Sequence, residues 1–320
     1  MTKGKSPIMA QMEKVYRHTR ANSFGTRARY ESSCRNFIGF LDEKFKMKNL
    51  RNLHDKHVVA YIQYRQAEGI APKTLKNDLG AIRYMHDMIP NVKHELSDNK
   101  ELKKVFSIEL EKTPAVKGDR AWTEREYNDM QQFVQDMAES DRRGAETAAD
   151  VRDVMQLART MGLRVTEAVA MSRSQVEQAL RSGVYQVKHE AKNGKWRQVP
   201  LSVLGRQVME SRVQTVPRGD RLFIRPGEKT HAAVNRVEKF LQNNRLQFET
   251  VEGRESRMYQ GGSNALTYHG LRYNYVQDRV QQEMEKGYSK LQAAAIVTNE
   301  VGHERVEVIN VYLSRRITTQ

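Results

Sequence analysis

The sequence has almost no cysteine and no long apolar run. Cys34 is the single cysteine among 320 residues, which excludes a disulfide within the chain and a zinc site built from several thiolates. No segment approaches the roughly 18 consecutive apolar residues of a membrane-spanning helix. The N-terminal stretch MTKGKSPIMAQMEK also lacks the apolar core of a secretory signal. We therefore expect a cytoplasmic protein without membrane contact.

Acidic residues are too few to balance the basic ones. The chain has 54 Lys and Arg against 39 Asp and Glu, a formal net charge of +15. Of these, 24 basic and 14 acidic residues precede Ala121, and 30 basic and 25 acidic residues follow from there. Nucleic acid is the leading candidate partner for such a surface. A basic surface that serves only solubility is the alternative, and charge alone does not separate the two.

The chain has no internal repeat and is long enough for two domains. Helical spacing of apolar residues within 27–45, 50–68 and 72–88 predicts a helical domain over residues 1–112. The stretch 113–122 contains proline and glycine without periodicity and predicts a linker.

Residues 123–320 predict a second domain, mainly helical with a small β-sheet. Thr123 and Glu126 form a capping-box pattern at the start of a helix. Asn193-Gly194 predicts a β-hairpin with strands at 184–191 and 196–201. We expect a loop over 252–264, and the chain then continues in three helical segments, 268–286, 289–300 and 304–313.

Several residues of this second domain suit the cleavage of a phosphodiester without a metal. Such chemistry needs a nucleophile, cations for the transition-state charge and a general acid for the leaving oxygen. Arg164 follows the glycine helix stop of Met161-Gly162-Leu163-Arg164, and Glu167 lies close enough to hold its guanidinium. His269 and Arg272 are three residues apart, so both side chains point to one side of a helix. Tyr312 follows His303 by nine residues.

Taken together and in this order, these motifs resemble the tyrosine recombinase (phage integrase) family. The motifs are Gly162-Leu163-Arg164-x-x-Glu167, His269-Gly270-Leu271-Arg272, Gly302-His303 and the final Tyr312. The hairpin sequence KNGKWRQVPL at 192–201 is similar to the hairpin that carries the family's catalytic lysine. Lys192 takes that role in the resemblance, with Lys195 as the second candidate.

The resemblance implies a role for each motif residue. Arg164 and Arg272 clamp the non-bridging oxygens of the scissile phosphate, and Lys192 protonates the departing 5′ oxygen. His269 acts in acid–base chemistry at the tyrosine, His303 donates a hydrogen bond to the phosphate, and Glu167 supports the arrangement. Tyr312 becomes a 3′-phosphotyrosine, and no metal, nucleotide or other cofactor is implied.

The resemblance also implies a fold and partners. The fold is a helical, SAM-like core-binding domain followed by a mixed α/β catalytic domain, and the two close as a clamp on double-stranded DNA. Four protomers assemble on two duplexes, with DNA-bending accessory proteins as candidate partners, in a bacterial or phage-encoded system. The predicted DNA contacts, for which a solvated surface is the alternative, are Lys73, Thr74, Lys76, Asn77, Arg83 and Lys195.

Two other functions stay open at this point. A type IB topoisomerase or a telomere resolvase uses the same chemistry, although the two-domain length favours a recombinase that integrates, excises or resolves a DNA element. A DNA-binding module without catalysis is the other alternative, and the complete residue set argues against it. The segment 240–266 does not match the family pattern.

Overall fold

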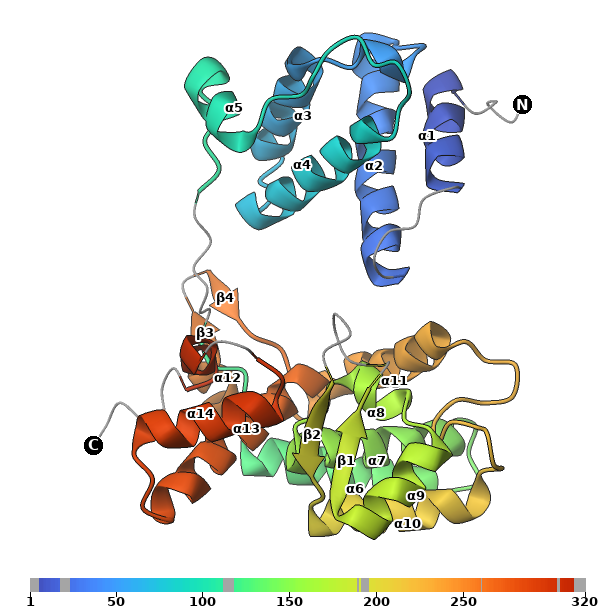
Figure 1. Ribbon diagram of the computed structural model, residues 1–320, viewed down its shortest axis with the longest axis vertical. Helices are drawn as coiled ribbons and strands as arrows, with labels where there is room; N and C mark the ends of the chain where they lie inside the picture. Colours follow the sequence, from blue (N-terminus) through green and yellow to red (C-terminus); the bar gives the residue numbers. More distant parts are fainter. Residues whose placement is uncertain are drawn as a thin grey trace. The chain divides into compact units, whose positions relative to one another are not determined.

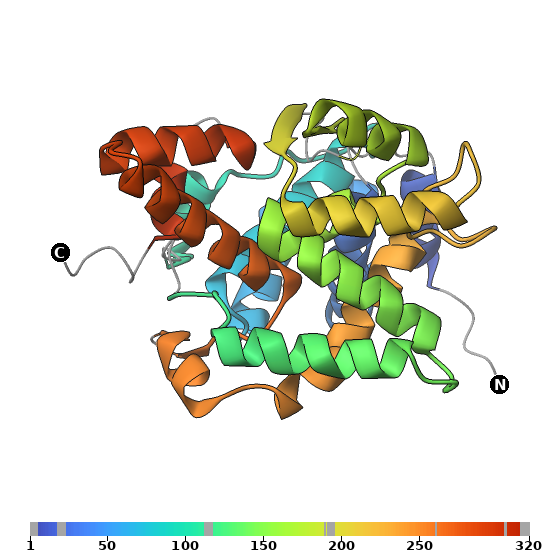
Figure 2. The same cartoon turned by 90° about the horizontal axis from the view of Figure 1, so that it is seen from below.

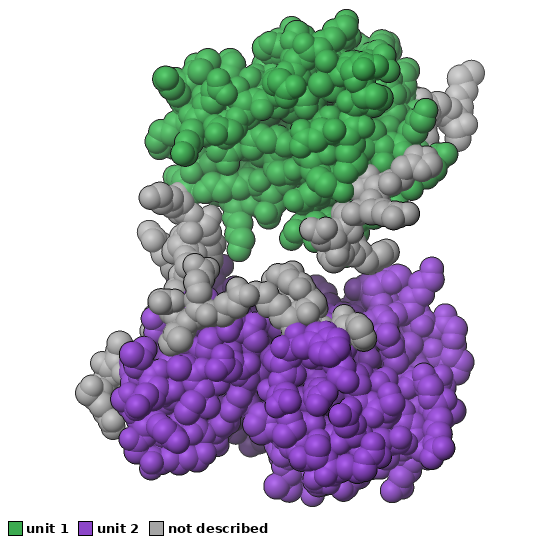
Figure 3. All heavy atoms as spheres, viewed as in Figure 1, with its two compact units in different colours: residues 1–114 green, residues 115–320 purple. Residues whose placement is uncertain are grey.

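The computed structural model describes residues 6–17, 24–111, 118–188, 190, 196–259, 261–303 and 306–313. The chain divides into two compact units, residues 1–114 and 115–320 (Figure 3). Of the expected linker, residues 113–117 lie outside the described part. Residues 118–122, which the sequence assigned to the linker, pack into the second unit, where Asp119, Ala121 and Trp122 are buried.

Unit 1 is a bundle of helices around an apolar core (Figure 1). Apolar residues on one stripe of the fourth helix, Leu75, Leu79, Ile82 and Met85, are all buried, as the helical spacing predicts. The helices are α1 (Pro7–Arg17), α2 (Phe24–Phe45), α3 (Asp55–Ala67), α4 (Pro72–Asp87) and α5 (Asn99–Phe106), with a 3-10 turn η1 (Leu50–Asn52).

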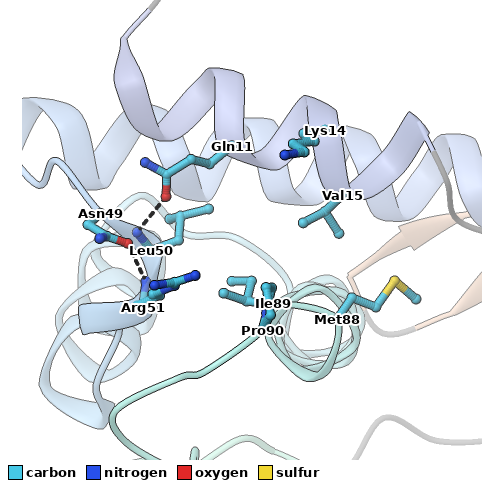
Figure 4. Close-up of a pocket in the computed structure, with 9 residues that line it drawn as sticks. All are labelled: Gln11, Lys14, Val15, Asn49, Leu50, Arg51, Met88, Ile89 and Pro90. Carbon is cyan, nitrogen blue, oxygen red and sulfur yellow. Dashed lines mark hydrogen bonds between the residues drawn. The ribbon is translucent and has the colours of Figure 1, made fainter.

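A pocket of about 470 Å³ lies in unit 1 between α1, η1 and the end of α4 (Figure 4). Gln11 closes one side of it, because its side-chain oxygen accepts a hydrogen bond of 2.9 Å from the backbone N–H of Leu50. Lys14 and Ile89 also line it. None of the predicted site residues lines this pocket.

Unit 2 is built around α7 (Ala145–Met161), which crosses between α6 (Glu124–Ala138) and α10 (Val203–Thr215) (Figure 2). The capping box predicted at Thr123 and Glu126 begins α6. The remaining helices are α8 (Val165–Val169), α9 (Arg173–Ser182), α11 (Thr230–Asn244), α12 (Val251–Ser256), α13 (Tyr268–Glu285) and α14 (Lys290–Glu300), with 3-10 turns η3 (Arg245–Gln247) and η4 (Val306–Val311).

The predicted hairpin is present but its strands are short. Strand β1 (Val184–Val187) pairs antiparallel with β2 (Arg197–Pro200), and Val187 lies opposite Arg197. The tip of the hairpin, residues 191–195, lies outside the described residues. The predicted mainly helical fold with a small β content is confirmed.

Two sequence predictions about local structure were wrong. The segment 252–264, expected as a loop, contains most of α12 and a short hairpin of β3 (Met258–Tyr259) and β4 (Gly262–Ser263). The reason is a tertiary ion pair: fully buried Arg257 donates to both carboxylate oxygens of Glu126 on α6, at 2.6 and 2.8 Å. Of the segment 304–313, expected as a helix, the described residues 306–313 contain the 3-10 turn η4, and Tyr312 follows that turn.

None of the helices in the described part of the chain is both long and apolar enough to span a bilayer.

Candidate active site

Five of the predicted residues converge in unit 2. Arg272 binds the backbone carbonyl of Gly162, two residues before Arg164, and that of Val301, two residues before His303. His303 in turn is hydrogen-bonded to Tyr312. The ring of His269 lies 6.1 Å from that of Tyr312, between ring centroids. Segments more than a hundred residues apart in the sequence therefore meet at one place.

Arg272 lies at the C-terminal ends of two helices. Gly162 is the C-cap of α7 and Val301 is the C-cap of α14, and their carbonyls accept from Nη1 and Nη2 of Arg272. The guanidinium thus faces the negative ends of two helix dipoles. Burial, followed by the charge of Arg164, lowers the pKa of Arg272 to about 10. It remains a cation at neutral pH, and its Nε has no hydrogen-bond partner among the described residues.

Arg164 is more accessible than Arg272. It is the N-cap of α8, and its Nη1 donates to Glu167 at 2.7 Å. Its side chain is 22% exposed, whereas Arg272 is fully buried. The preceding Gly162 has a φ of +61°, and a Cβ there would overlap the ring of Tyr275. A glycine is therefore required to end α7 where Arg164 can reach the site.

Glu167 is fully buried and has two arginine partners. Besides Arg164, it accepts hydrogen bonds from both Nη atoms of Arg197 on β2, at 2.8 and 2.6 Å. Burial alone would raise the pKa of Glu167, but the hydrogen bonds and charge of Arg197, with the charges of Arg164 and Arg272, outweigh it and lower the pKa to about 2. Glu167 is therefore an anion at any physiological pH.

Sequence reasoning did not select Arg197. Its Nε also donates to the carbonyl of Glu300, at 2.9 Å, so it joins the hairpin to the end of α14 as well as to Glu167. Two signals point to it: it is the arginine of the Lys-x-x-Lys-x-Arg pattern, and it alternates with exposed residues along β2. A buried arginine on a strand needs a buried anion, and Glu167 is that anion.

Tyr312 packs against the ring of Tyr273 and is hydrogen-bonded to His303. It is 4% exposed, and its ring centroid is 4.5 Å from that of Tyr273. Its hydroxyl is 3.0 Å from Nε2 of His303. The residue touching the hydroxyl is thus His303, which the resemblance had assigned to the phosphate, and not His269. Gly302, with a φ of +69°, turns the chain from α14 toward His303.

His269 stands in the first turn of α13, three residues before Arg272. Desolvation by the surrounding protein, and then the positive charges of Arg272 and Arg120, lower the pKa of His269 to about 4. Its side chain is nonetheless exposed. At neutral pH His269 is therefore uncharged.

Lys192 and Lys195 lie outside the described residues. Trp196 follows them in the hairpin and is 65% exposed. Nζ of Lys188 lies 5.6 Å from the centroid of the Trp196 ring. The paired strands anchor this hairpin next to the site through Arg197.

The predicted DNA contacts of unit 1 fall into two groups. Lys73, Thr74 and Asn77 are exposed on α4. Lys76 and Arg83 have partners within the unit: Lys76 donates to the carbonyl of Glu111 at 2.8 Å, and Arg83 donates to the carbonyl of Ser97 at 2.7 and 3.0 Å. Arg83 is thus engaged in holding the chain before α5.

Within the described ranges, no three His, Cys, Asp or Glu side chains are grouped so as to hold a metal ion.

Comparison with known proteins finds one family model that matches within the first unit. Residues 6–93 match the N-terminal domain of phage integrases. No curated protein matches the sequence significantly.

Solved structures resemble nearly the whole chain. Lambda integrase (residues 75–356) bound to DNA has a TM-score of 0.62 at 16% identity, over 98% of this chain and 97% of that one. The Tn1549 transposon integrase in complex with transposon right end DNA has a TM-score of 0.56 at 13% identity, over 97% and 95%. The XerH site-specific recombinase in a post-cleavage complex has a TM-score of 0.57 at 16% identity, over 95% of this chain and 80% of that one. The chain therefore shares the fold of these integrases and of this recombinase, and residues 6–93 match the N-terminal domain of phage integrases.

Proposed function

We propose that this chain is a site-specific DNA recombinase that cuts and rejoins DNA through a 3′-phosphotyrosine on Tyr312. The observation that carries the proposal is the pairing of the Tyr312 hydroxyl with His303, at 3.0 Å, beside the two cations Arg164 and Arg272. A tyrosine hydroxyl held by a histidine next to two arginines, of which Arg272 is buried, has the parts needed to attack a phosphodiester.

The reaction follows from these parts. The Tyr312 oxygen attacks phosphorus while its proton passes to a histidine, either His303 in contact with it or uncharged His269 nearby. Arg164 and Arg272 stabilise the charge that develops on the non-bridging oxygens. The bond from phosphorus to the 5′ oxygen breaks, and Lys192 of the hairpin protonates that oxygen. A 5′ hydroxyl of another strand then reverses the step, so no ATP is needed.

Double-stranded DNA is the proposed partner. The net charge of +15 favours a polyanion, and the similar integrases and recombinase are bound to DNA. By the same likeness we propose four protomers on two duplexes in the cytoplasm, with DNA-bending accessory proteins, acting to integrate, excise or resolve a mobile DNA element. The proposed DNA contacts are Lys73, Thr74, Asn77 and Lys195. Lys76 and Arg83 are proposed as further contacts, although both also bind backbone carbonyls of unit 1.

Covalent attachment to DNA tests this function. Wild-type protein, Tyr312→Phe and the control Tyr288→Phe, an exposed tyrosine, are incubated with nicked duplexes that tile the DNA flanking the coding sequence. Denaturing gels should reveal protein attached to DNA for the wild type and Tyr288→Phe only, with equal DNA affinity for all three. An adduct with Tyr312→Phe would refute the nucleophile. Tight binding without any adduct would favour a DNA-binding module, and relaxation of supercoiled plasmid without strand exchange would favour a topoisomerase.

A further inference from the structure

The backbone of Tyr312 is held by a side chain of α13. Nε2 of Gln277 donates a hydrogen bond of 2.8 Å to the carbonyl of Tyr312. The same amide nitrogen also lies 3.1 and 3.2 Å from the two carboxylate oxygens of Asp119. Gln277 is 3% exposed. One buried amide group therefore joins the backbone of the nucleophile to Asp119.

Asp119 belongs to the junction segment, residues 118–122, through which the chain comes into unit 2. Asp119 is 5% exposed, and its carboxylate accepts hydrogen bonds from the backbone N–H groups of Arg120 and Ala121, at 2.6 and 2.9 Å. Its carbonyl accepts from Asn264 at 2.8 Å. Buried polar groups that are satisfied in this way hold one backbone path. The backbone path of the junction segment therefore fixes the carboxylate of Asp119, and this carboxylate in turn holds the amide of Gln277.

Gly118 is the first described residue of the junction segment. It has a φ of +67°, and a Cβ built on it would lie 2.8 Å from the carbonyl oxygen of Met258 on β3. A side chain at this position would force the backbone of the junction segment or of β3 to move. The route of the chain into unit 2 is therefore fixed by close contact between two backbones.

Apolar packing joins the same partners. Ala121 of the junction segment, Tyr273 and Tyr312 belong to one buried cluster, separate from the main core of unit 2. The nucleophile is thus connected to the junction segment both by this cluster and by the amide of Gln277. A shift of the junction segment has a short, packed route to the backbone of Tyr312.

We propose that Gln277 is a positioning residue that couples the junction segment to the backbone of Tyr312, so that the path of residues 118–122 sets where the nucleophile lies. This inference rests on the proposed function of Tyr312. Gln277 holds the carbonyl of Tyr312 and not its hydroxyl, so it acts on the placement of the phenol and not on its proton.

A kinetic test separates placement from DNA binding. Gln277→Met keeps the length of the side chain and removes the donor, and Gln281→Met, which changes an exposed residue one turn along α13, is the control. We expect single-turnover adduct formation on the nicked duplex to slow by on the order of 10- to 100-fold for Gln277→Met, since small misplacements of a nucleophile have such effects. DNA affinity should be unchanged. Equal rates for both variants would overturn the proposal.

Exchanging the acid and the amide of this pair tests the link to Asp119. Gln277→Glu places a carboxylate against that of Asp119 and should slow adduct formation more than Gln277→Met does. Adding Asp119→Asn removes one of the two charges and supplies a donor, so the double variant should be faster than Gln277→Glu alone. A residue that only fills space would not respond in this way, and a double variant no faster than Gln277→Glu would contradict the coupling.

Hydrogen exchange tests the coupling without relying on activity. Gln277→Met and Gly118→Ala should raise amide exchange in the peptide covering residues 306–313. The controls Gln281→Met and Gly219→Ala, a glycine of φ +92° with open space around it, should leave that exchange unchanged. Unchanged exchange in the first two variants would overturn the inference. Raised exchange in a protein whose wild type forms no adduct would instead uphold the coupling and refute the proposed function.

Discussion

The ionisation of Glu167 depends above all on one neighbouring side chain. Arg197 supplies two hydrogen bonds to this buried carboxylate, and Arg164 and Arg272 add charge. The pKa of Glu167, about 2, lies below the ordinary value of 4.5. The pairing therefore stabilises the fold fully above pH about 4.5, and this contribution is lost as the pH falls toward 2.

Removing Arg197 should reverse this dependence. In Arg197→Met, Glu167 is a buried charge without its main partner, and its pKa rises. We expect the free energy of unfolding to fall by about 3–5 kcal/mol at pH 8 and by less at pH 5, because protonation then relieves the unpaired charge. Urea denaturation at the two pH values measures this.

Arg125→Met, which removes an exposed ion pair with Asp129 on α6, is the control and should change stability by less than about 0.5 kcal/mol. An equal loss for Arg197→Met at both pH values would show that the variant acts through packing and not through the charge of Glu167.

The residues proposed for catalysis could be named at the scale of single residues, but the partners that hold them in place could not. Arg164, Arg272, His303 and Tyr312 each lie within a short sequence motif. Arg197 and Gln277 act on partners 30 and 35 residues away. The hairpin pattern marks the arginine, but no local pattern identifies the partner of either residue. The partner of the Tyr312 hydroxyl also could not be read from spacing, because η4 replaces the expected helix and turns Tyr312 toward His303.

Among the elements, α12 and the β3–β4 hairpin depend on a contact made outside them. Helix α12 has only six residues, too few for a stable isolated helix. Arg257 at its end is fully buried and bound to Glu126 on α6, and the carboxylate of Glu126 also accepts from the backbone N–H of Thr250. Polarity and glycines made this segment resemble a loop, because the sequence does not display the ion pair that orders it.

Breaking that ion pair should loosen this segment first. Arg257→Met leaves Glu126 buried without its main cationic partner, so we expect faster amide exchange over residues 251–263. Global stability should fall by about 3–5 kcal/mol. The control is Arg254→Met, which changes an exposed arginine of the same helix and should alter neither quantity. Faster exchange spread evenly over unit 2 would contradict a local role for the ion pair.

At the scale of the whole molecule, charge and two-unit organisation were readable from sequence. Helical periodicity predicts the helices of unit 1, and the change to short strands around Asn193-Gly194 predicts the hairpin of unit 2. Where the junction segment begins could not be predicted, since Gly118 and Asp119 look like linker residues. Their burial depends on β3, Asn264 and Gln277, all far along the chain.

Binding to DNA should depend steeply on salt. If the basic surface neutralises six or more phosphates, affinity falls by at least about 10³ between 50 and 200 mM salt. Lys73→Ala, at an exposed position of α4, should lower the slope of log affinity against log salt by about 1. Fluorescence anisotropy with a labelled duplex measures both.

Lys44→Ala changes an exposed lysine that is paired with Glu43 and should leave that slope unchanged. A flat salt response of the wild type would exclude a phosphate-dominated interface, and an equal effect of the two variants would remove Lys73 from the DNA contacts.

The two tryptophans of the chain give it an optical reporter of its own. Trp122 is 1% exposed, and its indole N–H donates a hydrogen bond to the carbonyl of Thr267. Trp196 is 65% exposed, next to strand β2 of the β1–β2 hairpin. Acrylamide should therefore quench the emission of Trp196 and spare that of Trp122. A duplex arriving at the hairpin would shield one fluorophore and leave the other as an internal reference, so occupancy of the site is readable without any label.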